Sequence, residues 1–303
     1  MEMSFQVLKA GWELTKTYDN SASKYDAKPF ILIRNLNESM IERFYITTDQ
    51  NLRFFVTEDQ YCIGFEPERG KWLSCPNNTI TTGSTLQCSK CEEDDFFSCR
   101  KTCQGLRCFP KTPQAKAICD KKETYLYLTY VGGKFKVGVT LNPIRRWIEQ
   151  GSLYGTLLYK GYGLETRLYE HTIGTTLDLK MAVSINEKIA NLGVKSPSRS
   201  QIKQDFSNYF ASIKKLNLFK FETEPFLYNL TKYYQNIPLL DQKPLVDNKL
   251  IKGKVVGVIG RLLVVKDKNS LYATNLKELL GRILTKEKPT SGTYSKQRTI
   301  YDY

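Results

Sequence analysis

The chain has 303 residues and carries 45 Lys and Arg against 31 Asp and Glu, for a formal net charge of +14. Its apolar runs, such as VVGVIG at 255–260, are far shorter than the ~18 to 20 residues that span a bilayer. The first residues include Glu2 and lack the basic region and small-residue cleavage site of a secretion signal. We therefore expect a cytoplasmic protein rather than a membrane-spanning or secreted one.

The positive charge is confined to one part of the chain. Residues 1–120 hold 15 Lys and Arg against 16 Asp and Glu, whereas residues 121–303 hold 30 against 15. This asymmetry favours a polyanionic partner, because neutralised phosphates release counterions and supply most of the non-specific affinity. We expect nucleic acid, DNA or RNA, as the partner. The alternative is a Lys-rich surface that only keeps the protein soluble.

Residues 1–70 alternate apolar and polar side chains in stretches such as PFILIRNL and LRFFVT, with turn residues between them. This two-residue period predicts a β-rich domain. Residues 71–120 lack periodicity and are rich in turn formers. We expect a bound metal rather than an apolar core to hold this second segment together.

All eight cysteines lie within residues 62–119, and Cys88 and Cys91 form a C-x-x-C knuckle. The two-residue gap lets both thiolates reach one ion from a tight turn, and structural zinc takes four such ligands in a tetrahedron. The candidates for the four zinc ligands are Cys75, Cys88, Cys91, Cys99, Cys103 and Cys108. Cys62 and Cys119 lie at the margins and are interpreted as small buried apolar residues. Disulfides and an iron–sulfur centre are the alternatives for this segment.

From residue 121 the pattern changes to alternating strands and helices. A Gly132-Gly133 turn joins two strands, while Asn142-Pro143 and Gly151 supply the start and stop signals of a helix. The expected elements are strands at 124–131 and 134–140, a helix at 143–150, a strand at 155–162, a helix at 163–174, and mostly helical chain from 185 to about 216.

After residue 218 the strands return. The run KVVGVIGRLLVVKD at 254–267 is typical of a small barrel with glycine bends, and the polar last residues predict disorder unless a partner orders them. The expected fold is therefore α+β and multidomain. Its parts are a β-rich domain at 1–70, a Cys-rich zinc-binding module at 71–120, an α/β domain at 121–218, a small β-barrel-like domain at 219–285 and a polar tail at 286–303.

Residues 123–215 resemble the GIY-YIG nuclease superfamily, in the divergent branch whose second motif is K-[IV]-G-x-T. The segment from Tyr125 to Tyr127 is similar to the first motif, and Lys136-Val137-Gly138 is similar to the second. A helix with an arginine, a strand and a helix with a glutamate follow in the same order. With its WLSC and C-x-x-C segments, the whole chain also resembles an uncharacterised Cys-rich prokaryotic family found in archaea.

The resemblance implies a Mg- or Mn-dependent endonuclease, in which a glutamate holds the metal ion, tyrosines orient water and an arginine steadies the phosphate. Glu165 matches that glutamate, and Arg145 or Arg146 matches the arginine. Hard cations take carboxylate oxygen, and the guanidinium fork fits phosphate oxygens. The implied catalytic residues are Tyr125, Tyr127, Lys136, Arg145 and Glu165. The expected nucleic-acid contacts are Arg146, Lys160, Arg167, Lys195 and Arg199.

Two other functions stay open at this point. One is a catalytically inactive DNA-, RNA- or ribosome-associated binding protein on the nuclease scaffold, and the other is a scaffold for an acidic protein. A nuclease needs a tyrosine, an arginine and a carboxylate to converge on one point, whereas a binding protein does not.

Overall fold

The computed structural model describes residues 4–19, 22–38, 40–68, 71–82, 85–96, 113–194, 197–221, 225–237, 240 and 242–287. Within these ranges the protein is mixed α and β, with two large sheets and two short ribbons. No helix in the described ranges is long and apolar enough to cross a membrane.

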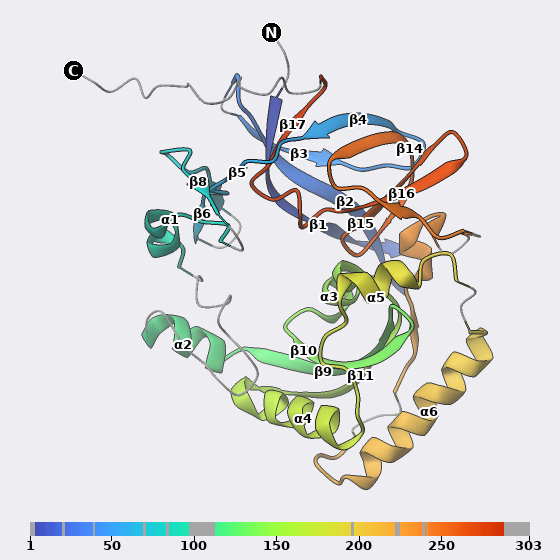
Figure 1. Ribbon diagram of the computed structural model, residues 1–303. Helices are drawn as coiled ribbons and strands as arrows, with labels where there is room; N and C mark the ends of the chain where they lie inside the picture. The colour runs from blue at the N-terminus through green and yellow to red at the C-terminus, as the bar shows by residue number, and fades with distance from the viewer. Residues whose placement is uncertain are drawn as a thin grey trace.

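The larger sheet has nine strands in the described part of the chain and combines strands from its two halves (Figure 1). The strands are β1 (Ser4–Asp19), β2 (Ala22–Asn35), β3 (Ile41–Tyr45), β4 (Asn51–Val56), β13 (Leu245–Val246), β14 (Leu250–Ile259), β15 (Leu262–Asp267), β16 (Ser270–Asn275) and β17 (Ile283–Thr285). Their order across the sheet is β13-β16-β15-β14-β4-β17-β1-β2-β3. The C-terminal unit expected to resemble a barrel therefore shares one sheet with the N-terminal strands, and the described strands form no closed barrel.

The smaller sheet has the order β10-β9-β11-β12. Its elements and the helices around it are β9 (Glu123–Val131), β10 (Lys134–Thr140), α3 (Pro143–Gln150), β11 (Ser152–Tyr162), α4 (Gly163–Thr176), α5 (Ile185–Ala190), α6 (Arg199–Lys215), β12 (Tyr228–Asn229) and a 3-10 helix (Thr231–Tyr234). The predicted hairpin, helices and third strand of this region are thus confirmed. Asn142 caps α3, and Gly151 ends it in the left-handed conformation at φ 77°.

The two sheets share one core, with α3 and α5 between them, while α4 and α6 cover the outer face of the smaller sheet (Figure 1). Trp147 of α3 is fully buried, and a Cβ at Gly155 would lie 2.9 Å from its ring, so a glycine on β11 lets the helix approach. Trp12 of β1 donates from Nε1 to the Gly260 carbonyl at 2.7 Å. The Tyr234 hydroxyl donates to the Ser152 carbonyl at 2.7 Å. The rings of Trp12 and Tyr234 pack edge to face with centroids 6.1 Å apart, and this contact joins the larger sheet to the smaller sheet's side.

The cysteine segment forms a small module beside the larger sheet (Figure 1). It consists of β5 (Gln60–Tyr61) paired with β8 (Ile80–Thr81), β6 (Phe65–Glu68) paired with β7 (Lys71–Leu73), and α1 (Ser89–Asp94); α2 (Pro113–Asp120) follows it. Gln6 Nε2 donates to the Cys62 carbonyl at 3.0 Å, and the Tyr61 N–H donates to the Gly281 carbonyl at 2.8 Å. The module is thereby attached to both β1 and the turn before β17.

Candidate metal centre and cation pocket

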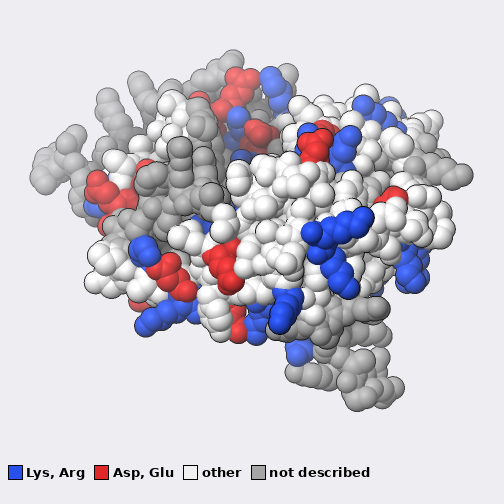
Figure 2. All heavy atoms as spheres, turned by 90° about the horizontal axis from the view of Figure 1, so that it is seen from below, with Lys and Arg blue, Asp and Glu red and all other residues white. Residues whose placement is uncertain are grey.

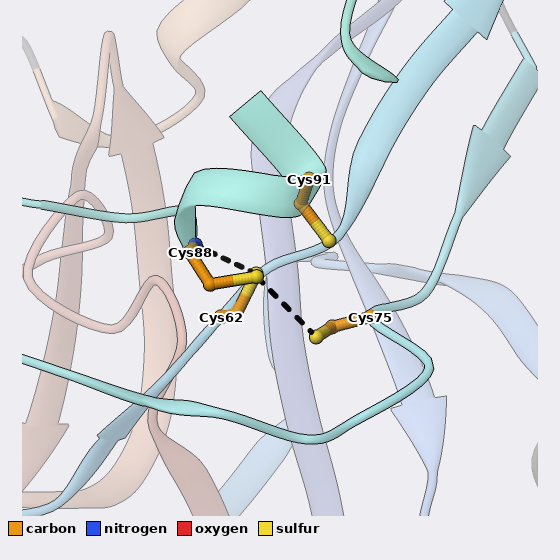
Figure 3. A group of neighbouring side chains, drawn as sticks. All are labelled: Cys62, Cys75, Cys88 and Cys91. Carbon is orange, nitrogen blue, oxygen red and sulfur yellow. Dashed lines mark hydrogen bonds between the residues drawn. The ribbon is translucent and has the colours of Figure 1, made fainter. Parts of the chain in front are cut away.

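Four cysteine thiols converge inside the module (Figure 3). Cys88 and Cys91 lie at the start of α1, Cys62 follows β5, and Cys75 lies in the loop before β8. The β5–β8 pairing brings Cys62 to Cys75's loop, because the Cys62 N–H donates to the Thr79 carbonyl at 2.7 Å. All four sulfur atoms lie within 4.8 Å of one another, and three of the four residues are buried.

The spacing of these sulfur atoms fits a single ion. Tetrahedral zinc with bonds of about 2.3 Å places its sulfur ligands about 3.8 Å apart, and the Cys75 and Cys88 sulfurs are separated by 4.0 Å. Burial raises the pKa of Cys62 and of Cys91. Burial also acts to raise that of Cys75, but hydrogen bonds from the Thr79 and Asn77 backbone outweigh it and lower the pKa to about 7. A cation offsets the cost of crowding buried thiolates together.

The cluster changes one prediction and leaves others open. Cys62, interpreted from the sequence as a small apolar residue, belongs to the group of four. Cys75, Cys88 and Cys91 were expected ligands and are present in it. Cys99, Cys103 and Cys108 lie outside the described residues. The five cysteines that the structure describes are free thiols.

A second group of candidate functional side chains gathers between the two sheets, beginning with Tyr127 on β9 and Lys136 on β10. Tyr127 is 1% exposed and Lys136 is 7% exposed. Lys136 Nζ donates to the Tyr127 hydroxyl at 3.4 Å and to the Val137 carbonyl at 3.1 Å. A Cβ at Gly138 would lie 2.4 Å from the Tyr127 hydroxyl and 2.8 Å from Lys136 Nζ. The glycine of the KVG motif is therefore required by the side chains that pass over it.

Arg146, rather than Arg145, joins this group. Both arginines are exposed, but Arg146 borders the space between the sheets and Arg145 does not. The backbone N–H of Arg145 donates to the Asn142 cap at 3.2 Å. Gln150 lies one turn after Arg146, and its amide oxygen, when it faces that arginine, accepts from Nε at 2.7 Å and from Nη2 at 3.2 Å. The same amide lies 3.2 Å from the Tyr127 hydroxyl. Gln150 thus links the arginine of α3 to the tyrosine of β9.

The α4 carboxylate close to these cations is Glu170 rather than Glu165. Glu165 accepts hydrogen bonds from the hydroxyls of Tyr159 at 3.2 Å and Tyr169 at 3.0 Å. Five residues further along the helix, Glu170 is rotated by roughly 140° from it. Burial raises the pKa of Glu170, while the positive charges of Lys136, Arg167 and Arg146 and a Val139 backbone hydrogen bond oppose that rise.

Lys136, Arg146 and Gln150 border a pocket of about 400 Å³ between the smaller sheet and the larger one, which we call the cation pocket. Glu170 borders a second hollow, between α2, α4 and β10. Its cationic residues are Lys136, Arg146, Lys188, Arg261 and Lys277, and its carboxylates are Glu149 and Glu278. Burial lowers the pKa of Lys188 to about 8, and repulsion from three other cations of the pocket, Arg261 first, acts in the same direction. Burial also lowers the pKa of Arg261; Glu149 opposes this and Arg146 adds to it. The pocket therefore holds more positive than negative side chains, and its cations repel one another.

The comparison with known families covers both candidate sites. A family model described as a protein of unknown function, DUF2797, matches residues 49–282, which include the four clustered cysteines and all cationic residues of the pocket. The chain belongs to the DUF2797 family. No curated protein and no solved structure matches the chain.

The other predicted contacts of this DUF2797 protein are spread over several surfaces. Lys160 forms an ion pair with Glu123 at 2.7 Å, and Arg167 borders a hollow between α2, α4 and β10. Arg199 borders a groove along α6. Tyr125 is half-buried on β9, and Lys195 lies outside the described residues. Figure 2 shows basic and acidic residues mixed on the α2 side, and mostly basic residues on the α6 side.

Sequence reasoning missed Glu170, Lys188 and Arg261. A signal for Glu170 was present, because Thr166 and Ile173 are buried on α4 and the i, i+4, i+7 spacing puts Glu170 on their face. A carboxylate on an otherwise buried helix face is a functional candidate. Arg261 comes from the β14–β15 turn, and its proximity to Arg146 arises from the packing of the two sheets.

Proposed function

We propose that this DUF2797 protein binds nucleic acid, with phosphate held in the cation pocket. The observation that carries the proposal is the excess of five cationic side chains over two carboxylates around one pocket. Two of the cations are arginines, whose guanidinium groups fit phosphate oxygens bidentately. A phosphate in the pocket relieves the repulsion among the cations, so binding has a favourable electrostatic component in addition to its hydrogen bonds.

A second candidate function is metal-dependent hydrolysis of a phosphodiester beside the cation pocket, as the GIY-YIG resemblance implies. In this proposal Glu170 takes the role expected of Glu165, and Arg146 takes that expected of Arg145. Mg²⁺ or Mn²⁺ suits a carboxylate oxygen ligand, and an ion held there is able to polarise the phosphate. Tyr127, with its hydroxyl between Gln150 and Lys136, completes the group.

The four-cysteine cluster has a structural role in this proposal, as a zinc site. Four thiolates in a closed, mostly buried site leave no open position for a substrate. A polynuclear iron–sulfur centre places iron and sulfide between its ligands and so requires wider sulfur spacing. Zinc at this point fixes the segment after β5 to the larger sheet in a cytoplasmic protein, where thiols stay reduced.

Binding is tested by the salt dependence of affinity for labelled single-stranded, duplex and branched DNA and a folded RNA. Arg146→Gln is compared with its neighbour variant Arg145→Gln. Losing one phosphate contact reduces the slope of log K against log salt by roughly 0.7 to 0.9. We expect that reduction only in Arg146→Gln. No binding at low salt contradicts the proposal and favours a scaffold for an acidic protein.

Hydrolysis is tested on the same substrates with Mg²⁺, with Mn²⁺ and with chelator. Glu170→Gln removes the carboxylate that interacts with Lys136, Arg167 and Arg146 and keeps the side chain's size, and Glu165→Gln on the same helix is the matched control. We expect metal-dependent cleavage to be lost only in Glu170→Gln. Intact but shifted bands with the wild-type protein mean a binding protein that does not cleave.

A further inference from the structure

An apolar hollow of about 100 Å³ adjoins the cation pocket, and both are bordered by Gln150 and Lys188. Its apolar walls come from both sheets and the segments between them, and include Leu153, Leu192, Ile237, Ile259 and Leu262. At roughly 10 to 15 Å³ of such space for each water molecule, the hollow admits on the order of seven to ten water-sized atoms. That is the size of a single planar ring system.

Backbone and amide groups shape one side of the hollow. The Gly132-Gly133 turn borders it, and a Cβ at Gly133 would lie 2.3 Å from Asn191 Oδ1. Asn191 is fixed in turn, because its Nδ2 donates to the Glu187 carbonyl at 2.7 Å. A mostly apolar hollow with a few fixed amide groups is typical of a site for a flat ligand that has polar edges.

The depth of the cation pocket limits what reaches it. Lys136 in its lining is only 7% exposed, and Arg261 and Asn275 of the larger sheet also line it. A phosphate between two stacked base pairs is held in a wide, stiff duplex and does not enter such a space. A phosphate that belongs to one unstacked or terminal nucleotide does.

We infer that the cation pocket and the apolar hollow together bind one nucleotide, with its phosphate among the cations and its base in the hollow. The inference rests on the proposed function, because it assigns a ligand class to the same pocket. Lys188 and Gln150 border both parts and therefore lie where the phosphate joins the nucleoside, and Lys188 is the cationic one of the two. The nucleotide is either free or the end of a strand, since both present the same chemistry.

Calorimetric titration at low salt tests the inference with nucleoside 5′-monophosphates, with the corresponding nucleosides and with inorganic phosphate. We expect at least one monophosphate to bind tenfold or more tightly than either its nucleoside or phosphate, because only the nucleotide fills both parts. Equal affinity for phosphate and for all monophosphates would overturn the inference. A 5′-phosphorylated decamer and its 5′-hydroxyl counterpart then separate the two sources: preference for the phosphorylated decamer over the monophosphate indicates a strand end, and the reverse indicates a free nucleotide.

Two variants and their controls connect this binding to the two parts of the site. Val194→Trp introduces a bulky ring beside the hollow, and Val246→Trp is its control, because the two valines are 56% and 55% exposed and only Val194 borders the hollow. Lys188→Met removes a pocket cation, with the exposed Lys266→Met as control. We expect Val194→Trp and Lys188→Met each to weaken monophosphate binding about tenfold to a hundredfold. Each control variant should leave this binding unchanged.

The outcomes also distinguish this inference from the proposed function. Oligonucleotide binding that depends on Arg146 but is accompanied by no binding of any monophosphate refutes the nucleotide site and leaves the proposed function standing. If neither oligonucleotides nor monophosphates bind, the nucleotide site and the proposed function are both refuted. A melting curve of each variant shows whether it is folded, and Val194→Trp binding phosphate with wild-type affinity but not the nucleotide supports the base assignment directly.

Discussion

Replacing Lys188 by Met should make the protein more stable at neutral pH, although it removes a charged group from the cation pocket. The pKa of Lys188 falls from 10.5 to about 8, which corresponds to on the order of 3 kcal/mol of unfavourable interaction in the charged form. Methionine keeps the apolar stem and lacks the charge. We expect the free energy of unfolding at pH 7 to rise by up to about 3 kcal/mol.

The way in which this gain in stability changes with pH shows whether the charge of Lys188 causes it. Between pH 8 and 10.5 the unfolded wild-type chain still holds the Lys188 proton and the folded chain has lost it, so wild-type stability rises with pH. About 2 kcal/mol of the cost has been regained by pH 9.5, and the advantage of Lys188→Met should shrink by that amount. The exposed Lys266→Met should change stability by less than about 0.5 kcal/mol.

Urea denaturation at pH 7 and at pH 9.5, followed by fluorescence, measures both effects. A variant less stable than the wild type at pH 7 would refute the reasoning, because it would mean that Lys188 has a stabilising partner. An advantage that is the same at both pH values would assign the gain to apolar packing instead. A variant with greater stability and weaker phosphate binding is the expected combination, because functional sites commonly hold unfavourable charge.

Three further predictions concern the remaining sites. Cys62→Ser should lower the zinc content measured by elemental analysis and the melting temperature, and Cys119→Ser, outside the cluster, should change neither. Gly138→Ala should cost roughly 1 to 3 kcal/mol in denaturant unfolding, since its methyl group overlaps the Tyr127 hydroxyl; no change would contradict the close approach. Tyr234→Phe should cost about 1 kcal/mol in the same assay through the lost bond to the Ser152 carbonyl.

Local signals predicted the smaller sheet well. The Gly132-Gly133 turn has φ values of 53° and 73°, which glycine adopts without strain, and it joins β9 to β10 where the sequence indicated a hairpin. The start and end of α3 follow from the Asn142 cap and from Gly151. Each of these features is set by residues a few positions apart, and such signals are present in the sequence.

Local signals of this kind do not predict contacts between residues that are far apart in the chain. Cys62 joins the cluster because β5 pairs with β8, a pairing that cysteine spacing does not reveal. Arg146 and Arg261 border one pocket because the two sheets pack together. Glu165 and Glu170 occur on the same helix, and only the position of that helix on the sheet determines that Glu170 lies nearer to Lys136 and Arg146.

The interleaved larger sheet also determines when the cation pocket is formed during synthesis. The smaller sheet is made from one continuous stretch and is able to begin folding as soon as that stretch has emerged from the ribosome. Its α3 face, which contacts both β1 and β14, is only partly covered until β14 to β17 follow, and β17 then inserts between β4 and β1. Arg261 arrives with these last strands. A nascent chain therefore has no complete pocket until residue 285 has emerged, so incomplete chains have no finished site with which to bind a phosphate.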